Sequence, residues 1–218
     1  LLVTLVLALG TARRAAAQGD PWKNAQSAFN QGETYYLSGK FDDAAASFKK
    51  AYEARPMPQF LYNVGAAYHM KGKKASEPES YDKAVDYYTR YLGENKDAKD
   101  KEQVEKVIAV LKAEAERLRA AAAAAAAAAA PDATNPTGTQ PTPTPPPAPS
   151  AEVEALGDAG YRGLVVIESE PQGANIYIGG KEKGPFAQTP WSGSMDGEFQ
   201  YLVEKRGYKS NEGRTSAD

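Results

Sequence analysis

The pattern of apolar and polar positions predicts helices over roughly the first 130 residues. Apolar residues recur there every three or four positions, which places them on one face of a helix, while glycine and proline lie mostly at segment boundaries. The first four predicted helices pair as two hairpins. The fifth has an apolar stripe along one face and charged residues on the opposite face. The predicted helices are 25–37, 41–53, 58–70, 81–92 and a fifth that begins between 97 and 100 and reaches 119.

A change in composition separates this helical part from the rest. Residues 120–130 are all alanine, the strongest helix former, so the fifth helix should continue along them until Pro131 stops it. Residues 131–160 are rich in proline and threonine at their start and are predicted to be a disordered linker. The helical domain is therefore predicted to span residues 21–130.

After the linker the pattern changes to the alternation typical of strands. Segments 164–168, 174–178 and 199–203 are predicted strands, separated by glycine-containing turns. Residues 211–218 are polar and are interpreted as a tail, which leaves 161–210 as a small antiparallel β domain. The fold class is thus α+β and multidomain: an all-α module with a capping helix, a linker and a β domain.

The two hairpins are related to each other as an internal repeat. Their leading glycines, Gly32 and Gly65, are 33 residues apart. The full set of matched pairs is Gly32 with Gly65, Tyr35 with Tyr68, Gly39 with Gly72, Ala44 with Ala84, Phe48 with Tyr88, and Ala51 with Tyr91. This pattern of small and aromatic residues resembles the tetratricopeptide repeat family. The second hairpin departs from it through an insertion at 73–79 between its helices, through Tyr91 in place of a small residue and through the absence of a closing proline.

A second resemblance concerns the β domain. Its turns and strands read Ser169-Glu170-Pro171-Gln172-Gly173-Ala174, then Ile176-Tyr177-Ile178-Gly179-Gly180, then Thr189-Pro190, Gly197 and Gly207-Tyr208. This arrangement resembles the PEGA domain family, with Gln172 in place of the usual Glu and Gly179 in place of the usual Asp. The resemblance also implies a last strand after Gly207-Tyr208, which the polar, glycine-containing residues 209–218 are not expected to form. The resemblance implies a protein of the bacterial cell envelope or surface, and it implies no catalytic residues.

Composition narrows the function classes. The chain has 26 basic and 28 acidic residues and a net charge of -2, which argues against a nucleic-acid partner. It has no cysteine and a single histidine, His69, so it lacks a thiol nucleophile, and no second nitrogen or sulfur ligand accompanies that histidine at a zinc site. We therefore expect no enzyme activity, no metal and no cofactor.

The resemblance to tetratricopeptide repeats also implies a concave groove made mainly by the first helix of each hairpin. It assigns six residues to this groove, in which aromatic rings supply apolar area and Asn63 is able to bond a peptide backbone. For His69, groove contact and plain packing stay equally open. The predicted groove residues are Phe29, Glu33, Tyr36, Tyr62, Asn63 and His69.

The beginning of the chain predicts export. Residues 1–10 are almost wholly apolar, and Ala15-Ala16-Ala17 before Gln18 offers the small-residue pattern of a signal peptidase site. Residues 1–17 are thus interpreted as a signal peptide, clipped at its N-terminus, of a periplasmic or cell-envelope protein.

Together these features predict a non-catalytic scaffold of the bacterial cell envelope whose repeats bind a protein or peptide partner, with wall or membrane-surface contact by the β domain. Two alternatives stay open. The β domain could itself be a module that binds cell wall or glycan, with Trp191, Tyr177 and Phe186 stacking on sugar rings. The chain could also be a regulatory fragment of a larger protein.

Overall fold

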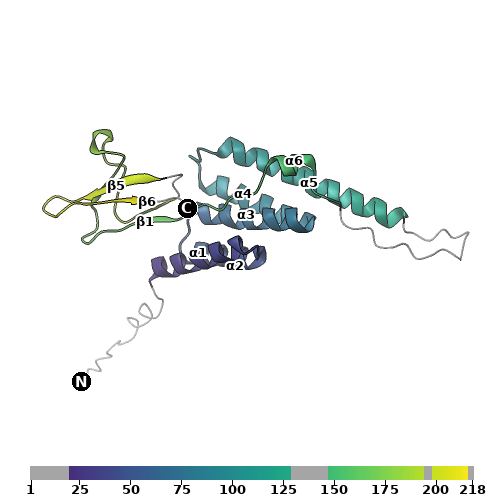
Figure 1. Ribbon diagram of the computed structural model, residues 1–218, viewed down its shortest axis with the longest axis horizontal. Helices are drawn as coiled ribbons and strands as arrows, with labels where there is room; N and C mark the ends of the chain where they lie inside the picture. The colour runs from purple at the N-terminus through teal and green to yellow at the C-terminus, as the bar shows by residue number, and fades with distance from the viewer. Residues whose placement is uncertain (1–19, 129–146, 194–197, 216–218) are drawn as a thin grey trace, which may run out of the picture.

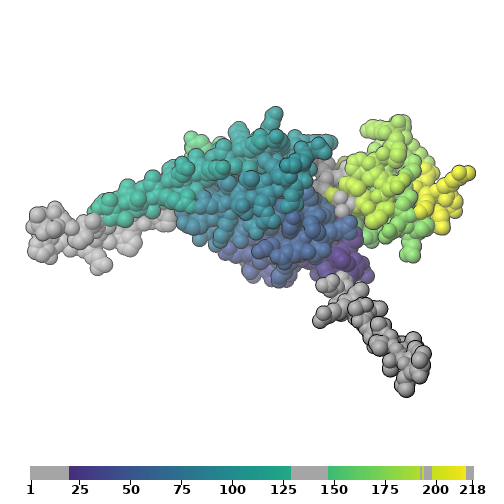
Figure 2. Space-filling model, turned by 180° about the vertical axis from the view of Figure 1, so that it is seen from behind, coloured from purple at the N-terminus to yellow at the C-terminus, as the bar shows by residue number. Residues whose placement is uncertain are grey.

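The computed structural model describes residues 20–128, 147–193 and 198–215. Helices α1 to α5 form one module and the strands form a second, smaller one, and the two lie side by side as separate lobes (Figures 1 and 2). The predicted α+β architecture is confirmed. The interpretation of residues 1–17 as a signal peptide lies outside the described residues.

Two helical hairpins open the described chain. They are α1 (Pro21–Leu37) with α2 (Phe41–Ala54), and α3 (Pro58–Ala75) with α4 (Pro78–Glu94). Proline begins three of these helices, where its missing N–H has no helical partner to lose. Asp20 caps α1 by accepting a hydrogen bond from the backbone N–H of Trp22 at 3.0 Å.

Close approach between glycine and an aromatic ring joins the two helices of each hairpin. A Cβ atom at Gly32 would lie 2.6 Å from Phe48, and one at Gly65 would lie 2.9 Å from Tyr88. Because no side chain fits at that distance, glycine is required at both positions. The predicted equivalence of these two glycine–aromatic pairs is confirmed.

The hairpin turns differ from the prediction. Gly39 turns the first hairpin with a positive φ of 70°, whereas Gly72, its predicted counterpart, is buried inside α3 against Tyr81. The second turn is made by Ser76, with φ 50°. The residues expected to be an inserted loop, 73–79, therefore mostly lengthen α3 and α4.

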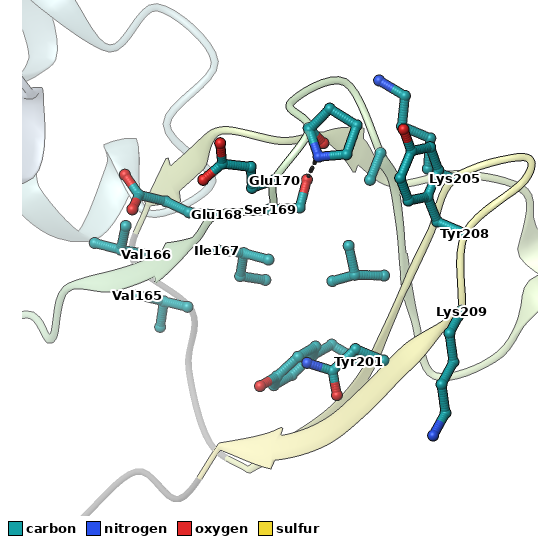
Figure 3. A pocket seen from close by; sticks show the side chains of 14 residues that line it. Val165, Val166, Ile167, Glu168, Ser169, Glu170, Tyr201, Lys205, Tyr208 and Lys209 are labelled. Atoms are coloured by element: carbon teal, nitrogen blue, oxygen red, sulfur yellow. Dashed lines mark hydrogen bonds between the residues drawn. The ribbon is translucent and has the colours of Figure 1, made fainter.

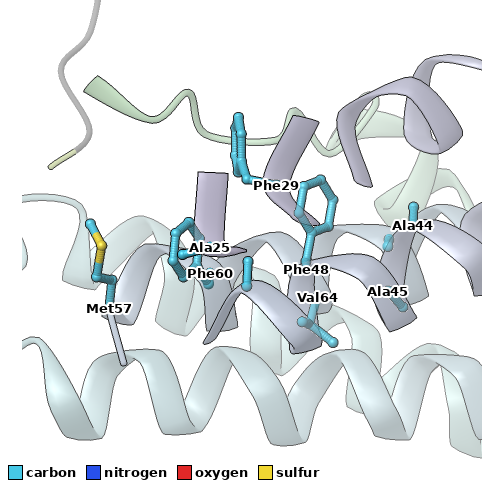
Figure 4. Close-up of a cluster of buried hydrophobic side chains, with 10 residues drawn as sticks. Ala25, Phe29, Ala44, Ala45, Phe48, Met57, Phe60 and Val64 are labelled. Carbon is cyan, nitrogen blue, oxygen red and sulfur yellow. The ribbon is translucent and has the colours of Figure 1, made fainter. Parts of the chain in front are cut away.

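The first core cluster fills the space between α1, α2 and α3 (Figure 4). Small residues let the helices approach, and aromatic rings occupy the remaining volume, with Phe29 5.7 Å from Phe48 and 6.0 Å from Phe60 between ring centroids. Its buried members are Ala25, Phe29, Ala44, Ala45, Phe48, Ala51, Met57, Phe60, Val64 and Ala67.

Helix α5 (Lys101–Ala128) caps the second hairpin, as predicted. Its stripe of Val104, Leu111, Ala115 and Leu118 is buried in a second core cluster with residues of α4, whereas the described alanines from 122 onward are exposed. The alanine run thus extends α5 away from the β domain (Figure 1).

The β domain holds two antiparallel sheets. One pairs β1 (Val165–Ile167) with β4 (Trp191–Gly193). The other has the order β3 (Ala187–Gln188), β2 (Asn175–Ile178), β5 (Phe199–Glu204), β6 (Asn211–Thr215). A short 3-10 helix, η1 (Lys181–Lys183), follows β2.

Two sequence-based boundaries are wrong. Residues 211–215, interpreted as a tail, form β6 and pair with β5 from Phe199 opposite Thr215 to Val203 opposite Asn211, so the expected last strand is present. The described part of the linker predicted at 131–160, residues 147–160, packs on the helical module and contains helix α6 (Ala151–Ala155), because Val153 is fully buried against the second core cluster.

Candidate functional site

Residues 147–164 run along the helical module, by way of α6, before the chain enters the β domain (Figure 1). We call residues 157–164 of this path the return segment. Backbone and side-chain contacts join it to α1 and α3, and Tyr161 and Leu164 pack against the first core cluster. Five of the six residues predicted to line a groove, all except His69, contact this segment, and we call the site that they form the groove.

Asn63 holds the backbone of the return segment at one residue. Its side-chain Nδ2 donates to the carbonyl oxygen of Arg162 at 2.9 Å, and its Oδ1 accepts from the backbone N–H of Arg162 at 2.7 Å. Asn63 is fully buried, so its amide depends on this partner for both hydrogen bonds. The pair imitates one rung of a β-ladder and is independent of the side chain that the bound residue carries.

Tyr161 enters an aromatic pocket. Its ring centroid lies 5.4 Å from Tyr36 and 6.5 Å from both Phe29 and Phe48, and its hydroxyl donates to Glu33 at 2.5 Å. Burial, with the hydrogen bond to Glu33, raises the pKa of Tyr161 to about 12. The pocket thus favours a neutral phenol that meets a carboxylate.

The next residue, Arg162, lies over a tyrosine ring. Its guanidinium is 3.7 Å from the ring centroid of Tyr62 and 4.8 Å from that of Tyr91. It also donates to the Tyr91 hydroxyl at 2.9 Å and forms an ion pair with Asp100, which precedes α5. A planar cation is therefore recognised by stacking and by two directed hydrogen bonds.

The N-terminal part of the return segment is held by weaker contacts. Tyr36 donates its hydroxyl to the carbonyl of Ala159, and the N–H of Ala159 lies 3.3 Å from the sulfur of Met70. Lys73 donates to the Gly157 carbonyl at 3.3 Å and pairs with Asp158 at 3.1 Å. Burial raises the pKa of Tyr36, so this hydroxyl also stays neutral and able to donate.

Helix α6 anchors the segment from its N-terminal side. Glu114 of α5 is buried and accepts from the backbone N–H of Ser150 at 3.1 Å and from Arg117 at 2.8 and 2.9 Å. Arg117 in turn donates to the Ala148 carbonyl at 2.7 Å. The hydrogen bond from Arg117 holds the pKa of Glu114 below its ordinary value, so the carboxylate stays charged.

His69 packs in the wall beneath the groove. It is 2% exposed, and neither ring nitrogen has a hydrogen-bond partner among the described residues. Burial, helped by nearby Lys73, lowers its pKa to about 4, so the ring is neutral at physiological pH. Of the two interpretations of His69, the geometry supports packing.

The structure thus brings Phe29, Glu33, Tyr36, Tyr62 and Asn63 together around the return segment, with His69 behind them. Sequence reasoning missed Met70 and Lys73, which lie further along α3. It also missed Tyr91 of α4 and Asp100 of the loop before α5. It also missed the occupant, although one signal was available: Tyr161-Arg162 stands between two glycines after a long proline-rich stretch.

The β domain carries a separate cleft of about 360 Å³ between its two sheets (Figure 3). Ile167 and Tyr201 lie on its walls, together with Lys205 and Tyr208 from the β5–β6 turn and its flank. The residues proposed to stack on sugars lie elsewhere. Phe186 is 49% exposed and meets Trp191 edge-on at 5.1 Å, and Tyr177 lies beneath Lys181 at 5.8 Å.

Among residues 20–128, 147–193 and 198–215, no helix combines the length and the apolar character that crossing a membrane requires. Within the same ranges, no group of three or more His, Asp or Glu side chains is arranged to hold a metal ion.

Comparison with known proteins identifies one part of the chain. Residues 162–216 match the model of the PEGA domain family, which supports the resemblance stated from the sequence and includes strand β6. No curated protein and no solved structure matches the chain significantly.

Proposed function

We propose that this chain is a non-catalytic protein–protein interaction scaffold of the bacterial cell envelope, whose tetratricopeptide-like hairpins bind an extended peptide segment. The observation that carries the proposal is the double hydrogen bond between Asn63 and the backbone of Arg162. A buried amide placed to pair with both backbone groups of one extended residue is a device for holding peptide.

The surroundings of Asn63 support the same function. Aromatic rings of Tyr36 and Tyr62 offer stacking surfaces on either side of it, and Glu33 and Asp100 add acceptors. Rigid aromatic anchors and a few directed polar contacts are typical of binding energy concentrated at a small site. The described part of the groove has no nucleophile paired with a general base, which favours binding over catalysis.

The envelope location rests on two features. The β domain matches the PEGA family, and residues 1–17 have the composition of an export signal. Fractionation of cells that express the full chain tests it: recovery with the periplasmic or membrane fraction is expected, and recovery only with cytoplasmic markers would contradict it.

A peptide titration tests the groove itself. The full chain carrying Tyr161→Ala and Arg162→Ala, the open variant, should have a groove freed of its strongest occupant. A fluorescent peptide with the sequence of residues 157–164 should bind this variant saturably, and adding Asn63→Ala should weaken binding at least about fivefold. Absence of saturable binding to a folded open variant would refute the proposal.

The second candidate function is glycan binding by the β domain, which the exposed Phe186 ring beside Trp191 favours. Co-sedimentation of the full chain with purified cell wall tests it. Binding to cell wall that is lost in Trp191→Ala but kept in Tyr62→Ala would assign the binding activity to the β domain. If the unsubstituted chain does not sediment with cell wall, glycan binding by the β domain is refuted.

A further inference from the structure

We propose that the groove selects an internal segment in which tyrosine is followed directly by arginine, and that the return segment is a resident ligand which such a partner must replace. The proposal rests on the peptide-binding function above and names both its partner class and its regulation. It is inferred from the contacts that the side chains of Tyr161 and Arg162 make in the groove.

The tyrosine position is specified by a ring pocket with a carboxylate at its end. Three aromatic side chains surround the ring of Tyr161, and Glu33 accepts its hydroxyl at 2.5 Å. Phenylalanine would fill the pocket but leave Glu33 without this donor, and an acidic side chain would meet a like charge. Tyrosine is therefore the residue that satisfies both parts of the pocket.

The arginine position depends on planarity as well as charge. The guanidinium lies 3.7 Å from the centroid of Tyr62 while two of its nitrogens reach Tyr91 and Asp100. Lysine would bring the charge without the flat face and without the second directed donor. An arginine-to-lysine change in the partner should thus weaken binding even though the charge is kept.

The flanking positions are permissive. A Cβ atom added at Gly160 or at Gly163 meets no atom within 4 Å, and neither residue has a positive φ. Other amino acids therefore fit on both sides of the pair, and the recognised feature reduces to the two central side chains and their backbone. A partner therefore needs the Tyr–Arg pair but not the glycines that flank it in the return segment.

The groove is built for a chain that passes through. The return segment enters from α6 and leaves into β1, so its bound residues carry no terminal charge. Lys73, which donates to the Gly157 carbonyl, is also paired at 3.4 Å with Glu154 of α6, which stays in place when the return segment leaves. A partner therefore needs no free terminus, and an internal loop or unfolded stretch of a protein suffices.

The resident ligand makes binding competitive. Tethering gives a segment an effective concentration of about 1 mM for short flexible linkers, and here α6 docking and the β domain restrict it from both sides. A peptide in solution must therefore bind more tightly, or be present at a higher concentration, than the tethered return segment in order to replace it. Displacement needs only residues 157–164 to leave, because Val153 can stay buried against α5.

The test is fluorescence anisotropy with the full chain, unsubstituted and as the open variant. The parent peptide has the sequence of residues 157–164 with acetyl and amide ends. Its relatives carry the equivalents of Tyr161→Phe, Arg162→Lys, both Gly160→Ala and Gly163→Ala, or the Tyr–Arg order reversed. Circular dichroism and a cooperative melt establish that each protein is folded, and the milder protein variant Tyr161→Phe with Arg162→Lys repeats the titration with less disturbance.

The parent and the doubly alanine-substituted peptides should bind the open variant within about threefold of each other. The lysine and reversed peptides should bind at least about tenfold more weakly, and the unsubstituted protein should bind the parent at least about tenfold more weakly than the open variant. Equal binding of the parent, lysine and reversed peptides would overturn the partner class. Equal affinity of the two proteins would overturn the resident ligand, whereas no binding of any peptide to either opened protein would refute the peptide-binding function itself.

Discussion

Replacing Asn63 by alanine is the sharpest single perturbation of the groove. It removes the 2.9 Å and 2.7 Å hydrogen bonds to the carbonyl and N–H of Arg162 and leaves the other contacts of the return segment in place. A hydrogen bond contributes a net of about 0.5–1.5 kcal/mol, so the two together should stabilise the docked segment by about 1–3 kcal/mol.

Amide hydrogen exchange of Ala159, followed by NMR, measures this free energy. Its N–H keeps its acceptor, the Met70 sulfur at 3.3 Å, in both proteins, so undocking made easier by about 1–3 kcal/mol should speed exchange about fivefold to 150-fold. Core amides of α2 should change far less, because the helical module stays folded.

Thr89→Ala is the matched control. Thr89 is exposed on α4 and its hydroxyl bonds only to the Val85 carbonyl of the same helix at 2.7 Å. Exchange at Ala159 should be unchanged in this variant. If Asn63→Ala left the exchange of Ala159 within twofold of the unsubstituted chain, the two hydrogen bonds of Asn63 would not stabilise the docked segment and the reasoning about the groove would be wrong.

Two further predictions concern the helical module. In urea unfolding, Gly32→Ala should lower the free energy of unfolding by about 1–3 kcal/mol, because its Cβ would collide with the buried ring of Phe48. The control Gly93→Ala, whose Cβ would meet nothing within 4 Å, should be neutral or stabilise α4 by up to about 1 kcal/mol. Equal effects of the two substitutions would contradict the packing of Gly32 against Phe48. The pKa of His69 is lowered to about 4 from 6.5, so the unfolded chain takes up the proton first and the free energy of unfolding should fall by up to about 3 kcal/mol as the pH falls from 7 to 4. Because His69 is the only histidine in the chain, His69→Leu should make the free energy of unfolding depend less steeply on pH between 7 and 4. An equally steep dependence in this variant would mean that another group takes up the proton.

The helices and the packing within each hairpin could be predicted from local patterns in the sequence. A 3.6-residue period and small residues opposite aromatics are properties of neighbouring turns, so Gly32 and Phe48 could be paired by repeat logic alone. The turn of the second hairpin was misplaced, because Gly72 serves close packing against Tyr81 rather than chain reversal.

Features that depend on distant partners were missed. Asn63 and Arg162 are 99 residues apart, and the path of residues 147–164 follows from what it meets on α3 and α5, not from its own composition. Strand β6 was missed for a related reason. Its residues Asn211 and Glu212 are polar and exposed, as expected of an edge strand whose order comes from pairing with β5.

The central claim is that the return segment occupies the groove and so joins the β domain to the helical module. Because the chain has no cysteine, spin labels can be placed cleanly at Lys50→Cys on α2 and Lys183→Cys in η1, both exposed. Electron–electron distance measurement on the full chain should give one narrow distribution, which Asn63→Ala with Tyr161→Ala broadens. A distribution that is already broad in the labelled chain, and unaltered by those two substitutions, would contradict the account.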